Sequence, residues 1–385
     1  MRSHLAARMP VAFLGLLVVG ALLVATGCQQ APAAQGQPAA GGGGAAATQP
    51  IVWKFQSSFP AASIAHKSIE ELAKKVEAMS GGRLKWEVLP AGAVVPAFEV
   101  IDAVARGALD GGGTVPAYWV GKNPAASLFG TGPSFGMDAN DLLAWEYYGG
   151  GWELYQEFLT QELKVDVIGF HFAPIPTQPF GWFKQPVTSA SQLQGLKYRT
   201  VGLAAELFQE MGASVVSLPG GEIIPALEQG VIEAAEWNNP TDDKNLGFPD
   251  VAKNYMLQSY HQPVEYLEVL IARSKWNELP EDLKAIVRYG VMAESADWQW
   301  RTLDSNSRDL IDLVQNRGVQ LHTTPPDILR AQLRAWDVII ERHSAQNPFF
   351  AKVIQSQKEW ASRVVPYKVQ IYVDNTYAYE HYWKR

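Results

Sequence analysis

The sequence predicts a two-lobed α/β fold with one long helix that spans both lobes. Stretches with the two-residue period of strands alternate with stretches that have the helical period of about 3.6 residues, as in a sheet with crossover helices. Residues 51–385 exceed one ordinary hydrophobic core, so we expect two lobes. A helical pattern without proline covers residues 281–316, and at about 1.5 Å per residue it is too long for one lobe. The alternative is two helices that break near Gly290.

The first 28 residues have the pattern of a secretory signal. Two arginines precede an apolar run over residues 11–24, which is too short to span a membrane. Small residues then lead to Cys28, the only cysteine in the sequence, so no disulfide bond can form within the chain. A cysteine in this place resembles the lipid-attachment site of bacterial lipoproteins, although Ala25 stands where a leucine is usual. We expect lipidation at Cys28; the alternative is a cysteine inside an ordinary signal.

Residues 29–50 carry no charge and are rich in alanine, glycine, glutamine and proline. Such a segment cannot bury a core, so we expect a flexible tether. Together with the signal, it places the folded part on the outer side of a bacterial membrane, periplasmic or at the cell surface. Loss of the signal leaves 30 basic and 39 acidic residues, a net charge of −9, without a cluster of basic residues. This balance argues against a nucleic-acid partner.

The first part of the fold follows a strand–helix order. Strands are expected over residues 51–56 and 84–89, and helices over residues 63–79 and 98–106. A glycine-rich turn over residues 109–113 leads to a further strand or loop. This order predicts a parallel sheet whose strands are joined by crossover helices.

The same order returns later in the chain. The expected strands are 165–170, a short strand at Tyr198, 214–217 and 232–237, and the expected helices are 204–211, 223–229, 325–344 and 347–363. The end of the chain, residues 365–382, contains five tyrosines and is expected to be a packing arm or an oligomer contact.

Arg199 occupies the most informative position in the sequence. In the stretch QGLKYRTVGLAAELFQEMGA, residues 194–213, it ends a short strand directly before a helix. This is where open α/β folds hold small ligands. The guanidinium group offers a planar fork of donors that matches a carboxylate and does not lose its charge. We therefore expect Arg199 to bind a carboxylate ligand; the alternative is a surface arginine in an ion pair.

Two blocks of sequence carry a resemblance to a known family. The first contains SGGRLKWEVLPAG and GALDGG, and the second runs from LKYRTVGL through LPGGEIIPALEQGVIEAAEWNNP. Both resemble the solute-binding proteins of tripartite ATP-independent periplasmic (TRAP) transporters, over nearly all of residues 51–340. The similarity is greatest to the branch that binds 2-oxo and 2-hydroxy monocarboxylates, such as pyruvate or lactate, beside a metal ion.

The resemblance implies a periplasmic-binding-protein-like fold in which a ligand is enclosed between two lobes and delivered to TRAP membrane permease subunits. Lobe I would comprise residues 51–173 and about 236–270. Lobe II would comprise residues 174–235 and about 271–340, including the spanning helix, and residues 341–385 would form a C-terminal helical arm. Because some relatives pair through their C-terminal helices, a homodimer is one expected state.

The family's site residues can be transferred one by one. The arginine that clamps the substrate carboxylate corresponds to Arg199, and a glutamine that reaches both metal and substrate corresponds to Gln178. The acid–aromatic pair that ligates the metal corresponds to Glu236 and Trp237, the tryptophan through its carbonyl oxygen. A second metal-ligating acid usually lies in a His-Glu-Pro sequence. Here Gln262 takes its place between a histidine and a proline.

The charges of these residues bear on the ion. Gln178 and Gln262 offer neutral amide oxygens, and Glu236 is the one predicted carboxylate. With Arg199 and a ligand carboxylate the site sums to −1, which favours Na⁺, or no metal, over Ca²⁺ because a buried net charge is costly. Glu265 or Glu268 could replace the missing acid if the strand register were shifted.

The remaining candidates would line the ligand cleft. They are Phe59 after the first strand, Tyr118 and Trp119 after the glycine turn, and Asn238 beside the acid–aromatic pair. Packing in the core is the alternative for the aromatic residues. His261 is expected to be structural.

The sequence does not have the pattern of an enzyme. It contains no His-Glu-x-x-His motif and no cysteine within the fold. A binding protein is therefore the expected class. An extracellular ligand sensor and, with less support, a secreted hydrolase or lyase are the alternatives.

Overall fold

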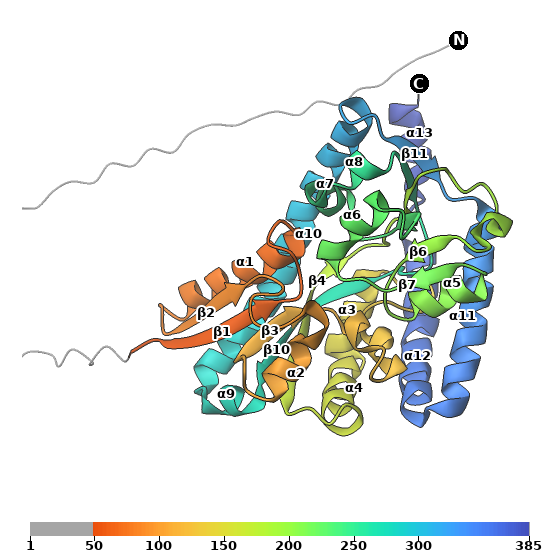
Figure 1. The fold of residues 1–385 in the computed structure, drawn as a ribbon. Helices are drawn as coiled ribbons and strands as arrows, with labels where there is room; N and C mark the ends of the chain where they lie inside the picture. The colour runs from red at the N-terminus through yellow and green to blue at the C-terminus, as the bar shows by residue number, and fades with distance from the viewer. Residues whose placement is uncertain (1–48, 385) are drawn as a thin grey trace, which may run out of the picture. The chain divides into compact units, whose positions relative to one another are not determined.

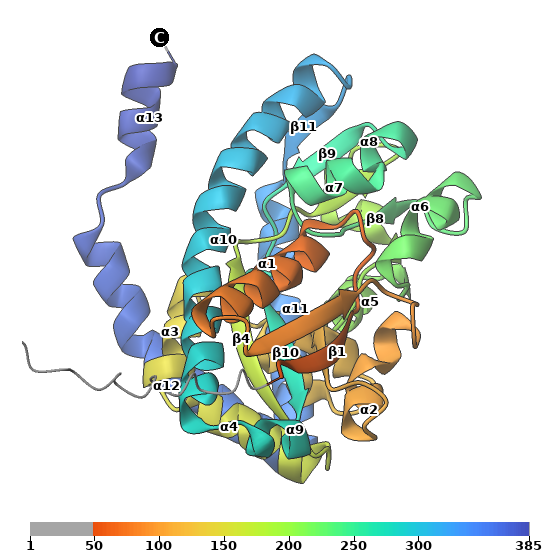
Figure 2. The same cartoon turned by 90° about the vertical axis from the view of Figure 1, so that its left-hand side faces the viewer.

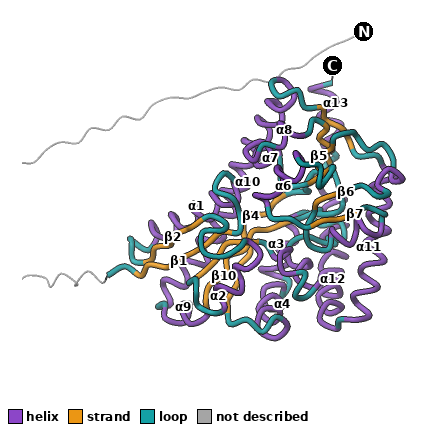
Figure 3. Tube along the Cα trace, in the orientation of Figure 1, coloured by secondary structure: helices purple, strands orange, loops and turns teal. Residues whose placement is uncertain are grey.

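The computed structural model describes residues 49–384, and their strands form two sheets (Figures 1 and 3). The predicted signal, Cys28 and almost all of the tether lie outside these residues. Within them, none of the helices is both long and apolar enough to cross a membrane. We call the first sheet with its helices lobe I and the second sheet with its helices lobe II.

The sheet of lobe I has five strands in the order β2-β1-β3-β10-β4. Strand β1 pairs in parallel with β2 and β3, whereas β10 is antiparallel to both β3 and β4. Its strands are β1 (Ile51–Ser57), β2 (Leu84–Leu89), β3 (Gly111–Thr114), β4 (Val167–Ile175) and β10 (Glu265–Ala272). The helices of this part are α1 (Ile64–Met79), α2 (Val100–Ala105), α3 (Ala139–Tyr148), α4 (Gly151–Glu157) and α9 (Arg273–Glu278).

The sheet of lobe II has six short strands in the order β11-β9-β5-β8-β6-β7. The predicted strand–helix repeat forms the parallel pairs of β6 with β7 and with β8. The strands are β5 (Gly181–Phe183), β6 (Lys197–Arg199), β7 (Ser214–Val216), β8 (Ala234–Ala235), β9 (Asn254–Leu257) and β11 (Gln320–Thr323). The helices are α5 (Ala204–Glu210), α6 (Gly220–Glu228), α7 (Pro240–Leu246) and α8 (Phe248–Val251).

Both sheets are mixed, so the expected parallel pairing holds for only part of each sheet. The reason is that the chain passes twice between the sheets without a helix, from β4 to β5 and from β9 to β10, and each passage adds an antiparallel strand. The lobe boundaries given above remain predictions. Strand β9 nevertheless lies inside 236–270, assigned there to lobe I, and pairs within the second sheet.

These two passages, which we call the crossovers, run side by side. The Gln178 amide donates to the Gln262 carbonyl at 3.1 Å, and the Thr177 hydroxyl donates to the Pro263 carbonyl, also at 3.1 Å. Each crossover therefore supports the other at the point where the lobes join.

The predicted spanning helix is α10, Glu281–Gln315, and it is continuous. Gly290 lies inside the helix and does not break it. The glycine has no side chain, which lets α10 approach α1 closely. A Cβ atom at Gly290 would lie 3.1 Å from the Met79 side chain and 3.4 Å from that of Val76. The helix also contacts β4 and α7, so it touches both lobes, and Figure 2 shows it running past both.

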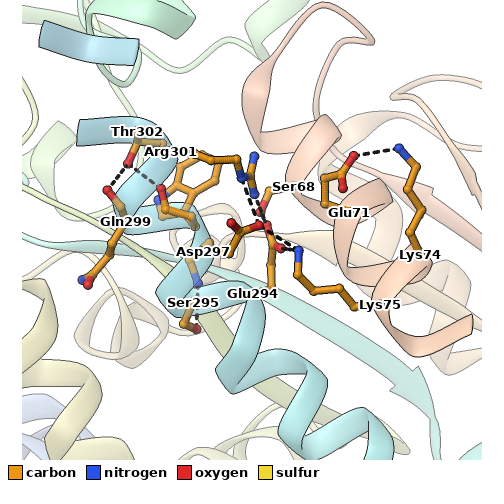
Figure 4. A network of polar contacts seen from close by, with 12 residues as sticks. Ser68, Glu71, Lys74, Lys75, Glu294, Ser295, Asp297, Gln299, Arg301 and Thr302 are labelled. Atoms are coloured by element: carbon orange, nitrogen blue, oxygen red, sulfur yellow. Dashed lines mark hydrogen bonds and ion pairs between the residues drawn. The ribbon is translucent and has the colours of Figure 1, made fainter. Parts of the chain in front are cut away.

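Ion pairs attach α10 to each lobe. The Glu294 carboxylate, fully buried, accepts hydrogen bonds from Ser68 and Lys75 of α1 and from Arg301, each at 2.6 Å (Figure 4). Further along, Lys244 of α7 pairs with Asp309 at 2.8 Å. The helix is therefore anchored at two separate levels.

The chain ends in three helices, α11 (Pro326–Gln346), α12 (Pro348–Ile371) and α13 (Asn375–Trp383). The first two confirm the predicted helices, although α12 continues past residue 363 and through Pro366. Helix α13 has no buried residue and projects beyond α12 (Figure 2).

Candidate functional site

One cavity brings together all eight residues predicted to bind ligand or metal. Its walls come from lobe I, from lobe II and from both crossovers. The lining residues are Phe59, Val115, Tyr118, Ile175, Gln178, Arg199, Val201, Glu236, Trp237, Asn238, Gln262, Glu265 and Leu267. The volume of the cavity is about 20 Å³, which is room for about one water molecule or ion. Binding of a larger ligand therefore needs the walls to move apart.

Arg199 ends strand β6 and is only 1% exposed. Its Nε and Nη2 donate to the Leu218 carbonyl at 2.9 and 2.7 Å, and its Nη1 donates to the Glu236 carboxylate at 2.8 Å. The alternative of a surface arginine is thus wrong. In this arrangement the carboxylate partner of the guanidinium group is Glu236, so a ligand carboxylate would have to compete with Glu236.

Glu236 follows β8, near the end of the strand expected over residues 232–237, and is fully buried. Burial raises the pKa of its carboxyl group to about 7, while Arg199 acts in the opposite direction. The charged form of this carboxylate therefore depends on Arg199, or on a cation, to offset its burial.

Glu265 is a second acid in the cavity, at the start of β10. It is 5% exposed and accepts a hydrogen bond from the Gln178 side-chain amide. Burial, followed by repulsion from Glu236, raises its pKa well above the ordinary value. The cavity therefore contains a second carboxylate besides the predicted Glu236. With Glu265 ionised, the protein part sums to −1 and the ligand complex to −2.

Glu268, the other acid considered, points away from the cavity. Its carboxylate accepts from the Trp119 indole nitrogen at 2.6 Å and from the Tyr155 hydroxyl in the interior of lobe I. The pairing of β10 with β4 is irregular between Glu265 and Leu267, and both of these residues line the cavity. A local irregularity of this kind cannot be read from periodicity, and the only sequence signal was an acid within a buried run.

Gln178 and Gln262 lie on the two crossovers and are 2% and 0% exposed. The Gln178 amide oxygen is buried and accepts no hydrogen bond from a described residue, and the Gln262 amide makes none of good geometry. A buried amide oxygen without a donor is costly, and a hard cation is one partner that satisfies it. Among the described residues, no three histidine, cysteine, aspartate or glutamate side chains gather to hold a metal. The donor set here is two carboxylates with amide oxygens.

Aromatic residues form the wall around these polar groups. The Trp237 ring lies 5.4 Å from the Arg199 guanidinium carbon and meets the Phe59 ring edge-on at 6.4 Å. Phe59 in turn contacts Tyr118, with ring centroids 6.3 Å apart. Asn238 adds a buried amide beside Trp237. The contribution of each residue to ligand binding remains a prediction.

Two of the residues considered lie elsewhere. Trp119 is completely buried in the core of lobe I and does not line the cavity. His261 is also completely buried, and its Nδ1 lies 2.6 Å from the Ser259 hydroxyl. Burial lowers its imidazole pKa to about 3, so it is neutral. His261 is structural, as expected.

The fold and the cavity define a class: a two-lobed α/β binding protein with a buried arginine and buried acids where the lobes meet. Comparison with known proteins gives the family. The model of bacterial extracellular solute-binding protein family 7, DctP, matches residues 55–347. The chain belongs to this family, which consists of solute-binding proteins and not of enzymes, and the resemblance to TRAP solute-binding proteins is confirmed.

Individual relatives agree with this assignment. A monocarboxylate 2-oxoacid-binding periplasmic protein from Nostoc is 32% identical over 314 residues, which cover 82% of this chain and 85% of the relative. The TRAP solute-binding protein of Colwellia psychrerythraea, solved with calcium and pyruvate, has a TM-score of 0.79 and 29% identity and covers 86% and 99% of the two chains. The one from Pseudoalteromonas atlantica, solved with sodium and pyruvate, has a TM-score of 0.79 and 28% identity and covers 87% and 100%.

Proposed function

We propose that this protein captures a small 2-oxo or 2-hydroxy monocarboxylate, such as pyruvate or lactate, together with Na⁺ or Ca²⁺. The carrying observation is the buried Arg199 guanidinium group beside two buried carboxylates in one cavity. One cationic side chain matches one ligand carboxylate, and among the residues that the structure describes no second cationic side chain lines the cavity to hold a dicarboxylate. The Nostoc relative and the two pyruvate complexes support this ligand class.

Different residues of the cavity would bind the cation and the organic ligand. The cation would be held by oxygen donors, which hard cations prefer. These are the side chains of Glu236, Glu265, Gln178 and Gln262 and the backbone carbonyl of Trp237. A bound cation would supply positive charge for the ligand's carboxylate and its second oxygen. Glu236 would then turn to the cation, and Arg199 would exchange Glu236 for the free oxygen of the ligand carboxylate. The aromatic wall excludes water from this charge cluster, which strengthens every interaction in it.

A thermal melt tests the proposal. Pyruvate at 100 times its dissociation constant stabilises a protein by about 2.7 kcal/mol, which is several degrees for a chain of this size. We expect that shift in sodium or calcium buffer and a smaller one in choline buffer, with succinate as the negative control. Equal shifts in all three buffers would remove the cation from the proposal. The absence of any shift with pyruvate, lactate and longer homologues would contradict it.

The same proposal includes delivery to TRAP membrane permease subunits and attachment to the membrane through a lipid at Cys28. The sequence pattern around Cys28 and the extracellular family support these steps. Transport of labelled pyruvate into vesicles that contain the permease should require the protein. A sensor that signals to another partner would bind the same ligand without supporting uptake. Cys28→Ser should release the protein from the membrane fraction.

A homodimer is the assembly that we propose, through the projecting end of the chain. Helix α13 exposes Tyr377 to 76% and Trp383 to 78%, and it buries no residue. Exposed aromatic surface of this kind is typical of protein contacts. Sedimentation should show a dimer for the full chain and a monomer after deletion of residues 375–385. A monomer in both cases would contradict the dimer.

A further inference from the structure

Asp242 of α7 connects the cavity wall to the opposite lobe. Its carboxylate is completely buried and accepts from the Trp237 indole nitrogen at 2.8 Å and from the Asn238 side-chain amide at 3.3 Å. Both donors line the cavity. The neighbouring acid, Asp243, bonds to Trp182 and Tyr255 of the second sheet, which fixes α7 to lobe II.

The same carboxylate reaches into lobe I, 178 residues away in sequence. Asp242 Oδ1 accepts from the Ile64 backbone amide at 2.8 Å, and Oδ2 accepts from the Ser63 hydroxyl at 2.9 Å. These are the first groups of helix α1, which has 16 residues and no acid of its own in its first turn. The positive end of α1 therefore takes its negative partner from the other lobe.

A second contact between the lobes runs in the opposite direction. The hydroxyl of Ser127, a completely buried residue of lobe I, accepts from the Leu203 amide at the start of α5 at 3.0 Å. The preceding residue, Gly202, has a φ of 67°, and a Cβ there would lie 2.9 Å from the Ser127 hydroxyl. Each lobe thus contributes a side-chain oxygen to backbone amides of the other.

We propose that Asp242 is a positioning residue that couples the ligand-binding wall of the cavity to closure of the lobes. The same carboxylate holds Trp237 and Asn238 and also the first turn of α1, so a bound ligand and the closed arrangement stabilise each other. Opening must break these contacts before the ligand can leave. This inference rests on the proposed function, because it is the ligand that makes closure matter.

The inference predicts an effect on ligand release. Asp242→Asn keeps the size of the side chain but removes its charge and replaces one of its two acceptor oxygens with a donor, which then faces either Trp237 and Ser63 or the Ile64 amide. Ser63→Ala touches only the lobe I end of the contact. We expect each to raise the dissociation rate of pyruvate, about tenfold for Asp242→Asn, with a smaller change in the association rate. Stopped-flow tryptophan fluorescence of the full chain measures both rates.

Asp243→Asn is the matched control, since Asp243 is an equally buried acid whose side-chain partners all lie in lobe II. It should lower the melting temperature without a comparable rise in the dissociation rate. The Ser63→Ala and Asp242→Asn effects should be less than additive, because both variants break one contact. The inference would be overturned if Asp243→Asn raised the dissociation rate as much as Asp242→Asn does. It would also be overturned if the effects of Ser63→Ala and Asp242→Asn on this rate were additive.

Failure of the proposed function remains distinguishable. If the wild-type protein binds none of the acids tested, the proposed function fails on that result alone. The free energy of unfolding of the ligand-free protein is then measured for Ser63→Ala, for Asp242→Asn and for the double variant. A coupling between the two variants supports the contact between the lobes, and additive effects overturn it.

Discussion

Arg199→Ala should weaken pyruvate binding by about 100-fold or more, because a buried ligand carboxylate would lose its charged partner. Arg199→Lys should also bind poorly, by about tenfold or more, since a point charge cannot replace the planar fork. Isothermal titration in calcium or sodium buffer measures both. Unchanged affinity in the two variants would mean that Arg199 serves only its internal ion pair with Glu236.

The alanine variant also leaves Glu236 buried without its partner, which destabilises the protein. A double variant, Arg199→Ala with Glu236→Gln, removes the unpaired charge and should recover stability but not binding. Arg273→Ala is the control for loss of an arginine, because Arg273 pairs with Asp166 at 3.0 Å, away from the cavity. Weak binding by Arg273→Ala would attribute the effect to net charge alone.

The second large effect concerns the choice of ion. With a ligand carboxylate, Arg199 and both acids ionised, the site sums to −2 and is neutralised by Ca²⁺. If Glu265 keeps a proton, which its raised pKa favours, the sum is −1 and Na⁺ neutralises it. Calcium binding therefore releases a proton that sodium binding does not. Calcium affinity should rise with pH, up to about tenfold per unit, while sodium affinity changes less.

Titrations of each ion with pyruvate between pH 6 and pH 8 measure this difference. Glu265→Gln should lower calcium affinity by about tenfold or more, retain sodium binding and flatten the pH dependence. Glu268→Gln is the matched control, because this buried acid lies on the same strand and bonds to Trp119 outside the cavity. An ion preference that is unchanged in Glu265→Gln would exclude Glu265 as a ligand of the ion.

The stability of the ligand-free protein should change with pH in the opposite direction to the calcium affinity. An acid whose pKa is raised on folding holds its proton more tightly in the folded state than in the unfolded one. Between the ordinary value of 4.5 and the raised value of about 7 for Glu236, the free energy of unfolding therefore falls as pH rises. Ligand-free melts should show this decline, and calcium with pyruvate should offset it most at the alkaline end.

The sequence predicted the lobes, the spanning helix and most of the site from periodicity and from the resemblance. It could not predict the mixed sheets, because the crossovers from β4 to β5 and from β9 to β10 contain no pattern that gives strand direction. Glu265 was underrated for a related reason. Glu265 and Leu267 are two positions apart and both line the cavity, but the pairing that brings the start of β10 to this place cannot be read from the pattern of one strand. The internal partner of Arg199 depends on packing across 37 residues, which no local pattern shows.

The hydrogen-bonded crossovers have a mechanical consequence. They carry Gln178 and Gln262, and Glu265 follows the second of them, so these three oxygen donors lie on or beside the segments that join the lobes. Residues on the joining segments would move less during opening than Phe59, Tyr118 and the Trp237 ring, which belong to the lobes. These three donors should therefore keep nearly the same spacing in an open protein as in a closed one. We expect the cation to bind before the lobes close. The side chains that move on closure, Phe59, Tyr118 and Trp237, would then select the organic ligand.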